Sequence, residues 1–203
     1  MTTTITTLRE KLRVDLKDPD DTLWTDSTLE RHIQHAVLDI SQASPLQQKD
    51  TGLTITDPAT REIDISTITG LIAVDAVEYP INCYPKRYRN FKVWASILEL
   101  LIDELPIASA SLYLYYGKVH TIDSEGSTLP SYLEDLCIMG AGAYAALEWA
   151  SFSINQVNVG GRWTAQQYLS WASNQLERYQ IELRRYRARN GFRVYQLYMD
   201  NTL

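Results

Sequence analysis

The amino-acid sequence predicts an α+β protein: an antiparallel bundle of about four helices, a small inserted antiparallel β-sandwich or barrel, and an extended C-terminal tail. Helical periodicity marks both ends of the chain, period-two alternation marks its middle, and Gly191 ends the last helix. We therefore expect the helical bundle domain in residues 1–48 and 128–190. We expect the β domain in residues 50–122 and the tail in residues 191–203.

Two amphipathic helices open the chain. A helix is predicted over residues 4–17, because apolar residues recur there at steps of three and four: Ile5, Leu8, Leu12 and Leu16. The second helix begins at Thr25, which would pair Trp24 with Leu29 as a hydrophobic staple, or at Ser27, which would form a capping box with Glu30. The pattern allows both starts. Ser44-Pro45 ends this helix.

The middle of the chain has the pattern of short strands. Residues 53–56 and 61–65 alternate between apolar and polar side chains, which is typical of half-buried strands. Further strands are expected over 71–79, 88–94, 97–102 and 111–116. Residues 97–105 also suit a helix, because leucine is common in both states, but Pro106 and the flanking strands favour sheet.

Two more helices follow Pro130. Glu134 and Asp135 stand near the start of the third helix, where acidic residues suit the positive end of the helix dipole. Its body is apolar and small-sided all round, which indicates a central helix with close neighbours. The fourth helix is predicted over Trp163–Arg189, after a break at Asn155–Gly161. Its buried seam consists of Tyr168, Ala172, Leu176, Tyr179, Leu183 and Tyr186.

Composition narrows the class of protein. The 203 residues carry a net charge of −6, which argues against a general nucleic-acid coat. Two distant cysteines argue against a disulfide framework and favour synthesis in a reducing cytoplasm. The start lacks the pattern of a secretory signal, and no apolar run approaches the length of a membrane span, so no membrane partner is expected.

The sequence predicts no catalytic, cofactor or metal site. His32 and His35 lie three apart on one helix, with Asp39 next, but a metal site needs further ligands that nothing marks. Cys83 and Cys137 have no basic neighbour in sequence to favour a thiolate. A lone histidine, His120, follows a strand and is expected to be structural.

Charge is unevenly distributed along the chain. An acidic turn near the start and an arginine-rich end of the last helix would let copies meet front to rear, although two solvated faces are an alternative. The candidate acidic inter-subunit face is Asp15, Asp18, Asp20, Asp21 and Asp26. The candidate basic face is Arg178, Arg184, Arg185, Arg187 and Arg189. Arginine also suits phosphate, as does the cluster Lys86-Arg87-Tyr88-Arg89, so a nucleic-acid-binding accessory protein is the alternative function.

The succession of features resembles a known family. Trp24-Thr25-Asp26, followed by Leu29, Ile33, Ala36 and Asp39-Ile40-Ser41, resembles the opening of head–tail connector (adaptor, or head-completion) proteins of tailed bacteriophages. The resemblance continues through Asp64-Ile65-Ser66, Gly70-Leu71-Ile72, Val77-Glu78-Tyr79-Pro80, Lys118-x-His120, Thr128-Leu129-Pro130, the alanine-rich third helix and the arginine-ended fourth helix.

This resemblance implies a structural virion protein and not an enzyme. Such adaptors form a homo-oligomeric ring, commonly of twelve copies, beneath the portal protein of a filled head. The ring extends the channel, through which DNA passes without sequence-specific binding, and offers a surface to the next neck or tail protein. The family's C-terminal segment typically reaches the portal, sometimes as an added strand, and its anchors here would be Phe192, Val194, Tyr195, Leu197 and Tyr198. The β insertion departs from the compact, mostly helical family members.

Overall fold

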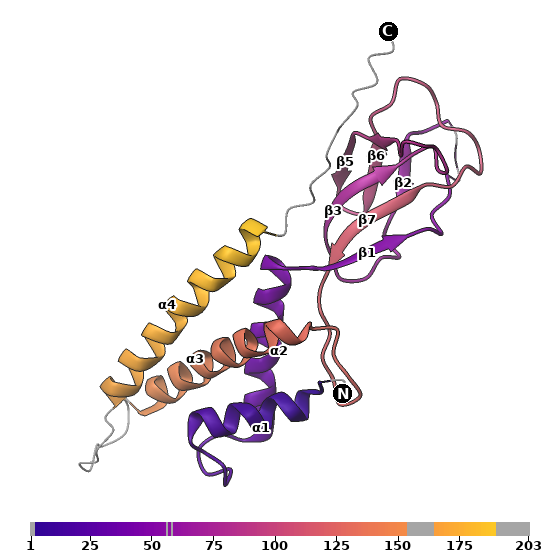
Figure 1. Ribbon diagram of the computed structural model, residues 1–203. Coiled ribbons are helices and arrows are strands. Elements are labelled where there is room, and N and C mark those ends of the chain that lie inside the picture. The colour runs from indigo at the N-terminus through magenta and orange to yellow at the C-terminus, as the bar shows by residue number, and fades with distance from the viewer. Residues whose placement is uncertain (1–2, 56, 58, 154–164, 190–203) are drawn as a thin grey trace. The chain divides into compact units, whose positions relative to one another are not determined.

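A computed structural model describes residues 3–55, 57, 59–153 and 165–189 (Figure 1). These residues form four α-helices, one short 3-10 helix and two antiparallel β-sheets, so the α+β class is confirmed. The chain divides into two compact units, which are described separately. Of the described residues, unit 1 contains those in 3–46 and 118–187, and unit 2 contains those in 47–117 and 188–189.

Unit 1 is helical. Its elements are α1 (Ile5–Leu16), α2 (Asp26–Ala43), the 3-10 helix η1 (Ser131–Leu133), α3 (Glu134–Ser153) and α4 (Ala165–Arg189). The starts of α1 and α2 follow the expected chemistry, because the hydroxyl oxygens of Thr4 and Thr25 accept hydrogen bonds from the backbone N–H groups of Thr7 and Thr28. Of the two predicted starts for the second helix, the structure therefore uses Thr25.

The helices of unit 1 share one apolar core. Alanines fill the middle of α3 with no exposed surface, as expected for a central helix: Ala141, Ala143, Ala145 and Ala146. Tyr179 of α4 is fully buried in this core, and its hydroxyl donates to the carbonyl oxygen of Ala36 on α2 at 3.1 Å. A Cβ atom on Gly140 of α3 would lie 2.6 Å from the Tyr179 ring. Glycine at this position therefore lets α4 approach α3 closely.

Unit 2 is built from strands in two sheets around a second apolar core. The strands are β1 (Leu46–Asp50), β2 (Glu62–Asp64), β3 (Leu71–Glu78), β4 (Tyr88–Arg89), β5 (Phe91–Trp94), β6 (Ile97–Leu100) and β7 (Tyr113–Lys118). One sheet has the order β1-β7-β3-β4 and the other has the order β2-β6-β5. Both sheets contribute to the core, since Leu98 of β6 and Leu114 of β7 are fully buried in it.

Three strand predictions need correction. Residues 53–56 form no regular strand in their described part, although a bridge from Thr54 to Ser111 and backbone hydrogen bonds join them to residues 109–112. Residues 88–94 form two strands that belong to different sheets and separate at Asn90. Strand β1 was not predicted, because its Leu-Gln-Gln-Lys-Asp lacks apolar alternation and its pairing comes from β7.

Candidate functional site

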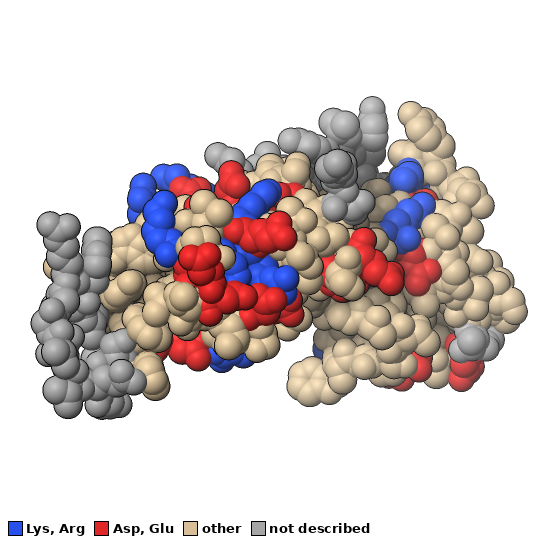
Figure 2. Space-filling model, turned by 90° about the horizontal axis from the view of Figure 1, so that it is seen from below, with Lys and Arg blue, Asp and Glu red and all other residues tan. Residues whose placement is uncertain are grey.

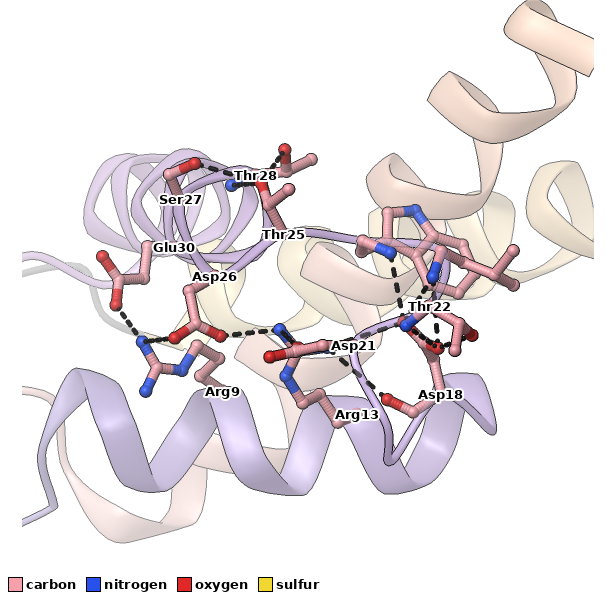
Figure 3. A network of polar contacts seen from close by, with 12 residues as sticks. Arg9, Arg13, Asp18, Asp21, Thr22, Thr25, Asp26, Ser27, Thr28 and Glu30 are labelled. Atoms are coloured by element: carbon pink, nitrogen blue, oxygen red, sulfur yellow. Dashed lines mark hydrogen bonds and ion pairs between the residues drawn. The ribbon is translucent and has the colours of Figure 1, made fainter.

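The predicted acidic face surrounds the α1–α2 loop, and much of it is neutralised within the chain (Figure 3). Arg13 of α1 pairs with Asp26 at 2.6 Å and also with Asp21. Arg9, one turn earlier, pairs with Asp26 at 2.9 Å and with Glu30 of α2 at 2.6 Å. These contacts join α1 to the start of α2, so their first consequence is local structure.

Asp18 lies at the centre of this network and is only 2% exposed. Its carboxylate accepts hydrogen bonds from the backbone N–H groups of Thr22, Leu23 and Trp24 and from the Thr22 hydroxyl. Burial alone would raise the pKa of Asp18, but these hydrogen bonds outweigh burial and hold the pKa below its ordinary value. Asp18 is therefore an internal support for the loop and does not lie on the surface.

The other members of the predicted acidic face are exposed. Asp15 and Asp20 make no ion pair with any described residue, whereas Asp21 and Asp26 are shared with Arg13. Figure 2 shows acidic and basic side chains interspersed on the face seen from below. A contact between this region and another subunit remains a prediction.

The predicted basic face lies on α4. Four of its arginines are exposed: Arg178, Arg184, Arg185 and Arg187. Arg185 pairs with Glu182 on the same helix. The opposite side of α4 packs into unit 1 through the buried Ala172 and Tyr179 and the partly buried Leu176, Leu183 and Tyr186, which confirms most of the predicted seam.

Some predicted residues lie outside the described parts of the chain. The side chain of Arg189 is one of them, as are the break at Asn155–Gly161 and the proposed anchors of the tail, Phe192, Val194, Tyr195, Leu197 and Tyr198. Their roles remain predictions.

His32 and His35 turn to different partners on α3. The Nε2 atom of His32 lies 2.5 Å from the carboxylate of Glu148, which also pairs with Arg31. Burial lowers the pKa of His32, although the contact with Glu148 opposes that shift. The ring of His35 stacks on Tyr144 at 4.2 Å. Within the described residues, no group of three potential ligands is arranged to hold a metal ion.

His120 has the structural role that the sequence predicted. Its ring is buried, and its two nitrogens lie 3.0 Å from the carbonyl oxygens of Thr128 and Ser44. Its backbone N–H donates to the hydroxyl of Ser41 near the end of α2. The residue therefore fixes the end of α2 against the loop that precedes η1.

The two cysteines occupy different surroundings. Cys137 is fully buried in α3, and burial raises the pKa of its thiol to about 12, so it is protonated at neutral pH. Cys83 is partly buried, and its Sγ atom lies 3.9 Å from the carbonyl oxygen of Ile81. The structure therefore gives Cys137 the character of a core side chain.

Two residues of the basic cluster Lys86-Arg87-Tyr88-Arg89 in unit 2 make polar contacts within that unit. Lys86 contacts the hydroxyl of Tyr115 at 3.1 Å, and that hydroxyl donates to the buried carboxylate of Glu78 at 2.7 Å. The side chain of Arg89 donates to the carbonyl oxygen of Tyr79 at 2.8 Å. Sequence reasoning missed the burial of Glu78, which no pattern in the strand signals.

Comparisons with known proteins give a limited likeness. No protein-family model matches the chain, and no curated protein matches it in sequence. The neck of an empty gene transfer agent (GTA) particle with C6 symmetry contains a similar chain, at 12% identity over 84% of this chain and 88% of that chain, with a TM-score of 0.30. The neck of a native GTA particle with C12 symmetry gives 12% identity, 85% and 93% coverage and a TM-score of 0.28.

A third similar chain comes from the virion of a native GTA particle, at 13% identity over 84% of this chain and 88% of that chain, with a TM-score of 0.30. The chain is thus similar to components of GTA particles and their necks, at low identity and low TM-score. Separately, no helix within the described residues is both long and apolar enough to span a membrane.

Proposed function

We propose that this chain is a structural protein of a virion neck, an adaptor that joins the portal protein to the tail. In this proposal, twelve copies form a ring under the portal. The ring extends the DNA channel and offers an attachment surface to the next neck or tail protein. The observation that carries the proposal is the two-sided character of α4, which is anchored in the core on one side and carries exposed arginines on the other.

The anchored side of α4 gives the exposed side a fixed position. Tyr179 is fully buried and bonded to the carbonyl oxygen of Ala36, and Gly140 leaves room for its ring. A helix held in this way presents its outer side chains without further ordering, which lowers the entropic cost of binding.

The exposed side of α4 has the composition of an interface. Arginine and tryptophan are enriched where proteins bind each other, and α4 carries exposed Arg178 beside exposed Trp171 and Ile181. Arg184, Arg185 and Arg187 extend the basic surface towards the end of the helix. Trp171 and Ile181 add exposed apolar side chains to this charged surface, as is common where proteins bind each other.

The order of the elements also supports the proposal. The family resemblance rests on a short first helix, an acidic turn, a second helix, a small-sided third helix and a long last helix, and the β insertion departs from the compact family members. The described chain has α1, the Asp18 loop, α2, seven strands, α3 and α4 in that order. Each element that carries the resemblance is therefore present at its expected place in the chain.

A ring needs two different complementary surfaces on each subunit. In this proposal the arginines of α4 form one of these surfaces. A candidate for the other is the α1–α2 corner, which consists of the α1–α2 loop and its acidic residues, and whose exposed members are Asp15, Asp20, Asp21 and Asp26. The C-terminal segment, residues 191–203, would dock on the portal. DNA would pass through the ring without base-specific contacts.

Electron microscopy of the purified protein mixed with DNA-filled heads that carry a portal but no tail tests this function. We expect a ring of extra density at the portal vertex, lost when residues 191–203 are deleted. A deletion variant that keeps the melting temperature of the full chain shows that the loss comes from docking. Heads that stay bare with the intact protein would contradict the proposal.

The exposed arginines also favour a second candidate, a nucleic-acid-binding accessory protein. Tyr179 and Tyr186 pack into the core and are thus not available to stack on bases. Binding of DNA that weakens steeply with added salt, together with bare heads in the microscope, would support this candidate.

A further inference from the structure

The three-stranded sheet of unit 2 has one buried face and one outward face. Strand pairing sets Ile63 of β2 opposite Leu98 of β6, and both are buried in the core, whereas Val93 of the edge strand β5, which shares this face, is 37% exposed. Because side chains alternate along a strand, the neighbours of these residues point the other way. The outward rows are Asp64–Ile97–Trp94 and Glu62–Glu99–Lys92, each crossing β2, β6 and β5 in that order.

Large apolar side chains lie on this outward face. Trp94 is 79% exposed and Ile97 is 37% exposed, and they stand opposite each other at the end of the β5–β6 hairpin. Leu101, which continues the alternation just past β6, is 52% exposed. A tryptophan and two aliphatic side chains on one face are typical of an interaction surface, since they lose contact with water only when a partner covers them.

The same face is negatively charged. Glu62, Asp64 and Glu99 are opposed by one cation, Lys92. Glu62 and Glu99 stand directly opposite each other on neighbouring strands, an arrangement that destabilises a sheet. Hydrogen bonds from Ser66 lower the pKa of the Asp64 carboxyl, which keeps it ionised. A cationic partner with apolar side chains would relieve this repulsion and cover Trp94.

The outer flank of α4 has the complementary chemistry. Four residues fall on one stripe because they are three, four or seven positions apart: Trp171, Arg178, Ile181 and Arg185. All four are exposed. The stripe combines two large apolar side chains with two positive charges, of which Arg185 also pairs with Glu182. The sheet face combines three large apolar side chains with an excess of negative charge.

We propose that the outward face of the β2-β6-β5 sheet of one copy binds the Trp171–Arg185 stripe of α4 in a second copy. The inference rests on the proposed function, because a contact between two different surfaces repeats from subunit to subunit and gives a ring when the rotation between subunits closes. It assigns the sheet face, in place of the α1–α2 corner, as the main partner of the α4 arginines. The corner's carboxylates are in part already paired with Arg9 and Arg13.

The spacing of the two surfaces agrees. Arg178 and Arg185 are seven residues apart, which is roughly 10 Å along a helix. Strands β2 and β5 are separated by two strand spacings, also roughly 10 Å. A helix lying across the strands would set one guanidinium on the carboxylates of β2 and the other on the ring of Trp94. Arginine binds both, as a bidentate donor and as a cation over an aromatic face.

Charge exchange tests the contact in the full-length protein. Sedimentation velocity over a concentration series measures self-association of the wild type, of Arg178→Glu/Arg185→Glu and of Glu62→Arg/Asp64→Arg. We expect each double variant to weaken association at least about tenfold, and the four substitutions together to restore most of it. Trp94→Ala should also weaken association. Glu104→Arg, a matched charge reversal at an exposed loop position outside the sheet, should leave association unchanged.

Several results would overturn the contact. One is a wild type that stays monomeric at every concentration, and another is a combined variant that associates no better than either double variant. Loss of association on deletion of residues 191–203, with no effect of Arg178→Glu/Arg185→Glu, would assign self-association to the C-terminal segment and overturn the contact. A ring on heads formed by Glu62→Arg/Asp64→Arg would refute this contact and leave the proposed function standing. Bare heads with the wild type would refute the function itself.

Discussion

The acidic corner between α1 and α2 and the basic flank of α4 look alike in sequence, as two runs of like charge, but the structure uses them differently. In the corner, Asp18, Asp21 and Asp26 are paired with Arg13 or with backbone N–H groups. On α4, Arg178, Arg184 and Arg187 extend outwards with no ion pair to any described residue.

The difference arises from chain geometry. A short loop that reverses the chain brings its carboxylates back to the helix it has just left, where Arg9 and Arg13 stand one turn apart. A long straight helix offers its outer side chains only the neighbours three and four residues away, and few of those on α4 are acidic. A charge run in a tight loop is thus more readily used within the chain than one on a helix flank.

The largest effect is expected at Asp18. Asp18→Ala leaves three backbone N–H groups and the Thr22 hydroxyl without their acceptor and removes one of the three carboxylates that pair with the buried Arg13, which should lower the free energy of unfolding by about 3–5 kcal/mol. Denaturant unfolding measures the change. Asp20→Ala is the matched control, because Asp20 is exposed and should change stability by less than about 0.5 kcal/mol. Equal effects at the two positions would contradict the internal role of the corner.

Gly140→Ala tests the anchored side of α4. The new Cβ atom would lie 2.6 Å from the ring of Tyr179, and relieving that overlap should cost about 1–3 kcal/mol. Gly142→Ala on the same helix is the control, because its Cβ atom would meet Leu12 at an ordinary 3.4 Å. The control should be neutral or slightly stabilising in thermal unfolding. A Gly140→Ala protein as stable as the control would show that α4 is not held against α3 as described.

Two carboxyl groups of unit 1, one in the α1–α2 loop and one at the start of α3, should also make the stability of the fold depend on pH. Hydrogen bonds hold the pKa of Asp18 below 3.8, despite burial, and contacts with Lys11 and Thr3 hold the pKa of Glu134 below 4.5. Lowered pKa values stabilise the folded state above those ordinary values, and the stabilisation is lost as the pH falls through the folded-state values.

Stability should therefore decline as the pH drops below 4.5, and Asp18→Asn should remove part of that decline. Denaturant unfolding of both proteins at a series of pH values between neutrality and strong acid measures it. A variant with the same pH dependence as the wild type would exclude Asp18 as a contributor.

The smallest effect on stability is expected on the basic flank. Arg184→Glu/Arg185→Glu/Arg187→Glu removes favourable charges from the end of α4 and one exposed pair, which should cost at most about 1 kcal/mol. Assembly into a ring should nevertheless be blocked. Calorimetry and sedimentation of the same samples separate the two effects, and unfolding of the variant would place these arginines in the fold instead of at an interface.

Local signals made much of unit 1 predictable. Thr25 was one of the two starts that the pattern allowed for α2, and the small-sided middle of α3 follows from side-chain chemistry within a few residues. The seam on α4 follows from periodicity, and Tyr179 is its fully buried member. These features need no knowledge of distant contacts.

The strands and the α1–α2 corner were harder to predict, because they depend on contacts between residues that are not neighbours in the sequence. Strand β1 carries a polar sequence and exists through its pairing with β7. Arg13 occupies a buried position on α1 because its charge meets Asp18, Asp21 and Asp26 across the loop. The face that combines Trp94 with Glu62 and Glu99 required the register of β2, β6 and β5, which the separate strand patterns do not give.

The most direct test of the neck-adaptor account is electron microscopy of tailless, DNA-filled heads incubated in parallel with the wild type and with Arg184→Glu/Arg185→Glu/Arg187→Glu. The account predicts a closed ring at the portal vertex for the wild type and no ring for the triple variant, with both proteins folded by calorimetry. A complete ring built from the triple variant, or a bare vertex with the wild type, would contradict it.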